Sequence, residues 1–349
     1  MTVKKLPHDV TFLHREDPLD PPEHRLPLRP DLTADDLKFR VDSQSTSIMQ
    51  TYLRLREAGY QNVSIAPWWR PGGICVVANG RFAARDHGTN CFVVSYRMDK
   101  PRPVMADMTI VQNLANVEGR SEVYMPYWPQ PGLIPRADDR GDRIETLAYK
   151  GRLVNFYEPF RTPEFQAELG RLGVRLVLDL DEGEKQAARW HDYSEADLVI
   201  AVRDLTKQDA LIKPASKLVN AWIAGSPAIL GPEPAYRDER RSDLDYVEVR
   251  SPADVLEAVR RLKEHPELYR RMIDNGRQRA ADFTTERMVE RWVAALSGPI
   301  AEGYRRWLET NRLGRLLRFP GRVLRQREAQ RIYLHNIHHG YRILSGTTT

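Results

Sequence analysis

Cysteine is scarce in this chain of 349 residues, which contains only Cys75 and Cys91. Both lie in apolar, strand-like runs, ICVVA and CFVVSY. Two cysteines without Cys-x-x-Cys spacing do not indicate a zinc site. We interpret them as reduced thiols in a hydrophobic core, which is typical of a cytosolic protein.

Long apolar runs are also missing. No run approaches the ~20 residues that would span a bilayer. The opening segment, MTVKKLPHDV, has lysines but lacks the apolar stretch of a signal peptide. Hydrophobic residues make up 41% of the chain and charged residues 29%, which is a globular composition. We therefore expect a cytoplasmic protein with two domains of roughly 150 residues each.

Acidic residues are few at the C-terminal end. Residues 301–349 contain ten arginines, no lysine and three glutamates, so they carry +7 while the whole chain carries +5. Within 301–344 the arginines alternate with apolar residues at helical spacing. Two compatible interpretations stay open: packing on the N-terminal domain, or peripheral contact with an anionic membrane at its inner face. We expect no nucleic-acid partner, because the rest of the chain is slightly acidic and contains no recognised binding module.

The order of apolar segments predicts an α/β fold with parallel sheets, because strands alternate with helices or long connections. Residues 1–36 are rich in proline and predict an irregular arm. A first Rossmann-like domain is expected over 37–135, and a second over 144–296. The Pro- and Gly-rich segment near 128–143 predicts the linker between them, and basic amphipathic helices are expected over 297–349.

Individual strands and helices follow from shorter patterns. LKFRV, at 37–41, predicts the first strand, followed by a turn at VDSQS and the helix STSIMQTYLRLREAGY. In the second domain IETLAYKG, VRLVLDL and ADLVIAV predict strands, and EKQAARWHDYSE, at 184–195, predicts a helix. Two such domains would face each other across a cleft, and ligands bind at the carboxyl ends of parallel strands.

The stretch KPASKLVNAWIAGSPAILG, residues 213–231, predicts an anion site. A helix that starts at Pro214 would offer free backbone N–H groups and its positive dipole end. The Ser216 hydroxyl and the ammonium groups of Lys213 and Lys217 would lie beside them, and a diphosphate suits this chemistry. Gly225 is placed to end the helix in the left-handed conformation. The alternative is an ordinary amphipathic helix with solvated lysines.

Residues 197–296 resemble the nucleotide-binding C-terminal domain of GT-B glycosyltransferases. The resemblance rests on ADLVIAVRD, on the pattern K-P-x-x-K-L-x-x-A-x-x-A-G-x-P within 213–227, and on the closing helices from SPADVLEAVRRL onward. It implies the GT-B architecture, with two Rossmann-like domains facing across a cleft. It also implies transfer of a sugar from a nucleotide-diphosphate donor to a carbohydrate or lipid-linked acceptor, in surface polysaccharide or glycolipid synthesis.

The resemblance also suggests which residues hold the donor. Basic residues after the first strand of the second domain and on the later helix contact the diphosphate in this family. Contacts to the base, ribose or sugar come from neighbouring positions. The residues at these positions are Arg152, Arg203, Lys213, Ser216, Lys217, Asn220 and Glu233.

Two glutamates eight positions apart, found in many retaining members, are missing. Ile212 and Asn220 stand at those positions. Direct displacement instead requires a base near the anomeric carbon. Asp42 lies in the loop that often supplies this base, although it is equally suited to cap the helix that begins near Ser45. The neighbours Asp86 and His87, in RDHGTN, are the rival candidates.

No convincing metal motif is present, so we expect neither a metal nor another cofactor; the nucleotide sugar is a co-substrate. GT-B members usually neutralise the leaving diphosphate with a helix dipole and basic side chains. Two alternatives to a transferase stay open. One is a sugar-nucleotide epimerase of the same fold, and the other is a non-catalytic binding or scaffold protein.

Overall fold

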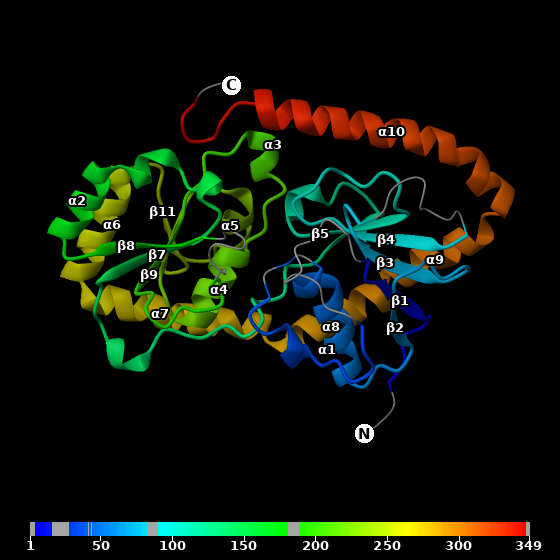
Figure 1. Ribbon diagram of the computed structural model, residues 1–349, viewed down its shortest axis with the longest axis horizontal. Helices are drawn as coiled ribbons and strands as arrows, with labels where there is room; N and C mark the ends of the chain where they lie inside the picture. Colours follow the sequence, from blue (N-terminus) through cyan, green and yellow to red (C-terminus); the bar gives the residue numbers. More distant parts are fainter. Residues whose placement is uncertain are drawn as a thin grey trace. The chain divides into compact units, whose positions relative to one another are not determined.

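The computed structural model describes residues 4–15, 28–40, 42, 44–81, 90–180 and 189–346 (Figure 1). The chain forms two compact units. The first consists of Met1–Trp128, Ile212–Pro214 and Thr285–His338, and the second of Pro129–Leu211, Ala215–Thr284 and His339–Thr349.

The first unit is built on a parallel sheet of six strands in the order β2-β1-β3-β4-β5-β6. Two of its central strands, ICVVA and FVVSY, are mainly apolar and buried along their whole length, as expected for a parallel sheet covered on both faces. The strands are β1 (Val10–Leu13), β2 (Val63–Ala66), β3 (Ile74–Ala78), β4 (Phe92–Tyr96), β5 (Met108–Val111) and β6 (Glu122–Tyr124).

The predicted irregular arm at 1–36 is wrong, because it contains β1, which lies between β2 and β3 in the sheet. The predicted strand LKFRV is also wrong. Leu37 ends a 3-10 helix over Ala34–Leu37, whose first turn is fixed by a capping box between Thr33 and Asp36, and residues 38–40 form no strand. The short segment VTFL thus forms a strand, while the described part of LKFRV does not.

Helices from both ends of the chain cover the first sheet. The predicted helix after Gln44 is confirmed as a π-helix at Ser45–Met49 continued by α1 (Gln50–Glu57). The helices near the C-terminus are α8 (Thr285–Ser297), α9 (Pro299–Glu309) and α10 (Arg312–His339). α8 was predicted to close the second domain, but it belongs to the first unit. The reason is visible in the core, where Trp292 of α8 contacts Phe12 of β1 and stacks on Tyr96 of β4.

The second unit is built on a parallel sheet of five strands in the order β11-β10-β9-β7-β8, so the predicted α/β class with two Rossmann-like units is confirmed. The strands are β7 (Thr146–Gly151), β8 (Arg175–Leu180), β9 (Leu198–Ala201), β10 (Ala228–Leu230) and β11 (Val247–Glu248). The helices are α2 (Pro163–Arg171), α3 (Lys207–Ala210), α4 (Ser216–Ala224), α5 (Pro234–Glu239), α6 (Pro252–Glu264) and α7 (Pro266–Ala280).

Local signals set the limits of two helices in this unit. Ser251 caps α6 and forms a capping box with Asp254. α4 ends at Gly225 in the left-handed conformation (φ 69°), as predicted. The predicted helix at 184–195 is wrong over its described part, because 189–195 form turns; residues 184–188 lie outside the described residues.

Candidate functional site

The candidate site lies where β7, β9 and β10 end. The carboxyl ends of neighbouring parallel strands share one edge of a sheet, and this edge is where α/β proteins bind ligands. β7 ends at Gly151 and leads into Arg152, β9 leads into Arg203, and β10 leads through Gly231 to Glu233. Three predicted donor residues therefore follow adjacent strands of one sheet.

The first turn of α4 also belongs to the second unit. Its N-cap residue, Ala215, provides no side-chain cap, and the first intrahelical bonds run from the N–H groups of Leu218 and Val219 to the Ala215 carbonyl. The N–H groups of Ser216 and Lys217 therefore have no acceptor within the helix and are able to bind another group. A nine-residue helix with such an amino end attracts an anion.

The side chain of Lys217 connects α4 to the end of β7. Its amine donates a hydrogen bond to the Lys150 carbonyl oxygen. The amine also lies 5.5 Å from the ring centroid of Tyr149 and 6.0 Å from that of Trp190. Burial and the charges of Arg203 and Lys150, opposed by the charge of Glu233, together lower the pKa of Lys217 to about 7. Lys217 is therefore a cation that an arriving anion would stabilise strongly.

The end of β7 requires a glycine at position 151, because there is no room for a side chain. A Cβ atom at this position would lie 2.8 Å from the Tyr149 hydroxyl and 3.2 Å from the Lys217 amine. The Tyr149 hydroxyl donates to the Arg152 carbonyl oxygen at 2.8 Å, so the backbone turns closely around it. The predicted glycine turn thus brings the chain next to Lys217, while the Arg152 side chain is exposed.

Arg203 and Glu233, which we expected to contact the donor, form a buried, bidentate ion pair with each other. Arg203 is 8% exposed and Glu233 is 0% exposed, and Nε of Arg203 donates to Oε1 of Glu233 at 2.9 Å. Despite burial, the Glu233 carboxylate raises the pKa of Arg203. The pair therefore fixes charge beside Lys217 and does not present it to a ligand.

Asn220 is also engaged within its own unit. Its Oδ1 accepts a hydrogen bond from the backbone N–H of Gln130 at 3.1 Å. Its side chain also hydrogen-bonds to Tyr193, whose pKa is raised chiefly by burial. In this arrangement Asn220 positions the start of the second unit, and its contact with sugar or ribose hydroxyls stays a prediction.

Lys213 belongs to a short segment of the first unit, Ile212–Pro214. Its amine lies 3.2 Å from Oδ2 of Asp99, and its carbonyl oxygen accepts from Asn113 at 3.1 Å. Burial acts to raise the pKa of Asp99, but the charge of Lys213 and its hydrogen bond outweigh burial and lower it. Lys213 is thus fixed in the first unit by an ion pair of its own.

Asp42 acts as a cap in the structure. Its Oδ1 accepts from the backbone N–H of Ser45 at 2.8 Å, and its carbonyl oxygen accepts from the Thr46 hydroxyl at 2.9 Å. Its other carboxylate oxygen, Oδ2, is buried without a hydrogen-bond partner in the described part of the chain. The rival candidates Asp86 and His87 lie outside the described residues.

His14 is a residue near this loop that the sequence analysis missed. β1 is the strand that precedes it, so His14 occupies the place after the first strand that was assigned to Asp42. The two segments are joined through Gln44, whose side chain accepts from the Arg15 N–H at 3.0 Å and donates to the Arg15 carbonyl at 2.8 Å. The sequence signal that could have identified His14 is the short, mainly apolar segment VTFL directly before this residue.

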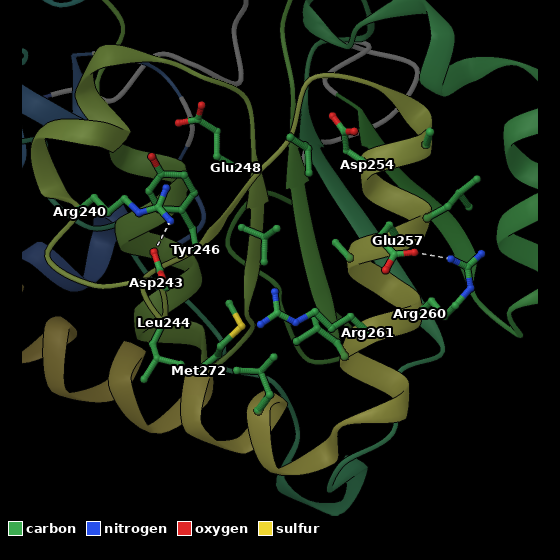
Figure 2. Close-up of a pocket in the computed structure, with 17 residues that line it drawn as sticks. Arg240, Asp243, Leu244, Tyr246, Glu248, Asp254, Glu257, Arg260, Arg261 and Met272 are labelled. Carbon is green, nitrogen blue, oxygen red and sulfur yellow. Dashed lines mark hydrogen bonds and ion pairs between the residues drawn. The ribbon is translucent and has the colours of Figure 1, made fainter.

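A cavity of about 930 Å³ opens elsewhere in the second unit, beside the edge strand β11 and between α6 and α7 (Figure 2). Its rim carries ion pairs, with 2.8 Å between Arg240 and Asp243 and 2.5 Å between Arg260 and Glu257. None of its lining residues is a predicted donor residue. The cavity is therefore separate from the strand ends that bring Lys217, Gly151 and Arg203 together.

Two further properties concern the described residues as a whole. They contain no group of three or more His, Cys, Asp or Glu side chains that could hold a metal ion. They also contain no helix that is long and apolar enough to cross a membrane.

No family model matches the chain, and no curated protein matches it. Several solved structures are similar. They include AviGT4, a glycosyltransferase involved in avilamycin A biosynthesis (14% identity over 87% of this chain and 98% of that chain, TM-score 0.49). HepE of Anabaena in complex with UDP-glucose is 9% identical (84% and 98% covered, TM-score 0.46). Sucrose-phosphate synthase from Thermosynechococcus elongatus is 15% identical (87% and 90% covered, TM-score 0.45).

Because the identities are low and the TM-scores are below 0.5, we base neither a residue's role nor a substrate on these similar structures. The two parallel sheets establish the fold class directly.

Proposed function

We propose that this chain is a glycosyltransferase that moves a sugar from a nucleotide-diphosphate donor to a hydroxyl group of an acceptor. The observation that carries the proposal is the meeting of the α4 amino end, the Lys217 amine and the glycine end of β7 at one sheet edge. Such a combination stabilises a diphosphate, which is the leaving group of the reaction. The pattern K-P-x-x-K-L around Lys217 adds the resemblance to nucleotide-sugar enzymes.

The residues have separate roles in this proposal. The backbone N–H groups of Ser216 and Lys217, the Lys217 ammonium and the exposed Arg152 bind the diphosphate. Arg203 and Glu233 act indirectly, because their ion pair sets the electrostatic surroundings of Lys217. We propose that helix dipole and basic side chains replace a metal, so turnover should persist when EDTA removes divalent cations.

The transfer step requires a base. Asp42 is our candidate, because one carboxylate oxygen is occupied by the Ser45 N–H while Oδ2 is buried and lacks a partner among the described residues. It would take the proton of the acceptor hydroxyl as that oxygen bonds to the anomeric carbon. The bond from this carbon to the diphosphate oxygen breaks, and the nucleoside diphosphate leaves.

The acceptor is proposed to be a carbohydrate or a lipid-linked sugar, and the reaction to serve surface polysaccharide or glycolipid synthesis at the inner face of a membrane. The basic segment 301–344 supports this location. Ten of its side chains are arginines, and such cations attract a chain to anionic lipid. The membrane location does not depend on the transfer step and is tested separately.

The experiment is a thermal-shift screen of UDP- and GDP-sugars followed by an assay for released nucleoside diphosphate. A ligand at 100 times its dissociation constant adds ~2.7 kcal/mol to apparent stability. A transferase should be stabilised by one donor and should release its nucleoside diphosphate when an acceptor is added. An epimerase would convert the sugar without needing an acceptor, and a scaffold protein would show no shift with any donor.

A further inference from the structure

The helix α10 packs on the first unit with polar side chains. Nε of Arg322 donates to the Val104 carbonyl at 3.2 Å, and its guanidinium lies 2.9 Å from the Asp107 carboxylate. Gln326 accepts from the Met105 N–H at 3.2 Å and donates to the Arg102 carbonyl at 3.1 Å. α10 is therefore attached by hydrogen bonds to the segment before β5.

The leucines of α10 point away from this attachment. Leu313 is 65% exposed, Leu317 is 73% exposed and Leu324 is 65% exposed. Their spacings of four and seven residues place them on one face of the helix. An amphipathic helix of a globular unit normally turns its apolar stripe toward the core. α10 (the long helix near the C-terminus in Figure 1) has no buried residue along its 28 positions, and its leucine stripe is exposed.

Positive charge accompanies the leucine stripe. α10 contains seven arginines and one acid, Glu328. Arg315 bonds to backbone carbonyls near Trp307, Arg322 pairs with Asp107, and Arg331 pairs with Glu328. Four arginines remain exposed and make no ion pair within the described ranges; these are Arg312, Arg318, Arg325 and Arg327.

We propose that the outward leucine stripe of α10, with its exposed arginines, docks on the surface of an anionic phospholipid bilayer. Leucines would enter the boundary between headgroups and acyl chains while arginines contact lipid phosphates. The charge favours lipid over an apolar protein partner, because the arginines surround the stripe and only one carboxylate lies on the helix. The helix would lie in the interface plane, since no described helix can cross a bilayer.

This proposal rests on the membrane location proposed above and deepens it, because it names the face of α10 that makes the contact. It does not depend on the transfer reaction, so its test uses no sugar. The full chain is mixed with vesicles of phosphatidylcholine alone or with added phosphatidylglycerol, and the bound fraction is measured by flotation. We expect binding only to the anionic vesicles. Binding should weaken as salt is raised, because salt screens the exposed arginines.

Two variants separate apolar from electrostatic contact. Leu317→Asp/Leu324→Asp should weaken binding by about tenfold or more, because two leucines no longer enter the interface. Arg318→Gln/Arg325→Gln should weaken it by about 25-fold, since each arginine near the surface contributes about fivefold. The matched control, Leu114→Asp/Val117→Asp, adds the same charge at exposed apolar positions of the first unit outside α10 and should bind as the wild type does.

Three results would overturn the proposal. The first is equal binding to neutral and anionic vesicles, or binding to neither. The second is wild-type binding by Leu317→Asp/Leu324→Asp. The third is a wild-type dimer that these substitutions convert to a monomer without any vesicle binding, because the leucine stripe would then serve a second copy. Circular dichroism and thermal unfolding establish that each variant is folded.

Discussion

Lys217 is the residue on which the proposed donor site depends most. Its pKa is lowered to about 7, whereas a lysine in water titrates near 10.4. The unliganded protein thus releases a proton from Lys217 near neutral pH, and a bound diphosphate would favour its return. Protonation and anion binding at this site are therefore linked.

This linkage predicts a pH-dependent affinity for a nucleotide sugar, whose diphosphate stays ionised over the range. The affinity should be constant below pH 7 and should fall above it by up to about tenfold per pH unit, because the neutral amine must take up a proton. Isothermal titration between pH 6 and 9 measures this. In the matched Lys217→Met variant the decrease above pH 7 should disappear, and an unchanged decrease would assign it to another group.

The same shift has a consequence for stability. Between pH 7 and about 10.4 the unfolded chain retains the proton that folded Lys217 has released. The free energy of unfolding of the unliganded protein therefore gains a contribution from Lys217 as the pH rises through this range.

Asp42 provides a second residue-scale prediction. Asn is isosteric with Asp and its Oδ1 can still accept from the Ser45 N–H, so Asp42→Asn should fold normally. If Asp42 is the base, turnover should fall by about 10²–10⁴-fold, the usual contribution of general base catalysis, with unchanged donor affinity. The assay is release of nucleoside diphosphate with acceptor present. Turnover close to the wild-type rate would limit Asp42 to its capping role.

At the scale of elements, α9 lies close against the first sheet because Gly303 carries no side chain. A Cβ at this position would lie 2.5 Å from Sδ of Met108 and 3.1 Å from Cζ of Phe92, both of which are buried. The close approach lets Tyr304 and Trp307 of α9 contact the Phe92 ring, with centroid distances of 5.7 and 6.2 Å. Gly303 thus determines how α9 covers β4 and β5.

We expect Gly303→Val to lower the free energy of unfolding by about 1–3 kcal/mol, because it overpacks this contact. The matched control is Gly321→Val in α10, where a Cβ would meet nothing within 4 Å. Gly321→Val should change stability little. Urea unfolding of both variants measures the difference, and equal stabilities would contradict the close packing of α9.

Most elements of the second unit could be predicted from the sequence, because their signals are local. Ser251 and Asp254 cap α6, and Gly225 ends α4. β1 could not be predicted, since three apolar residues and a threonine inside a Pro-rich segment give a weak signal; the strand is formed by pairing with β2 and β3. The 3-10 helix at Ala34–Leu37 was missed because its capping box, between Thr33 and Asp36, lies directly before the apparent strand pattern that begins at Leu37.

The candidate site was predicted unevenly for a similar reason. Lys217 and the glycine turn at Gly151 follow from local patterns, and the structure brings them together. Arg203 and Glu233 lie 30 positions apart, so only the fold reveals that they pair. Asn220 likewise bonds to Gln130, 90 positions away, and nothing near either residue in the sequence indicates it.

At the scale of the whole molecule, the chain alternates between its two units. It leaves the first unit at Trp128, returns for Ile212–Pro214, and returns again at Thr285. Consequently Lys213 is fixed in the first unit by Asp99, while α4 begins two residues after Pro214 in the second. The stretch that first indicated an anion site therefore contributes residues to both units.

The central claim is that a nucleotide-diphosphate sugar binds where α4 and β7 meet at Lys217. The most direct measurement is isothermal titration of the wild-type chain and of Lys217→Met with the best donor from the nucleotide-sugar screen, at pH 6.5. We predict that the wild type binds and that Lys217→Met binds about tenfold or more weakly, since a hydrogen-bonded charge contributes about 1.5–3 kcal/mol. Equal affinities of the two proteins, or no binding of any nucleotide sugar to the wild type, would contradict the account.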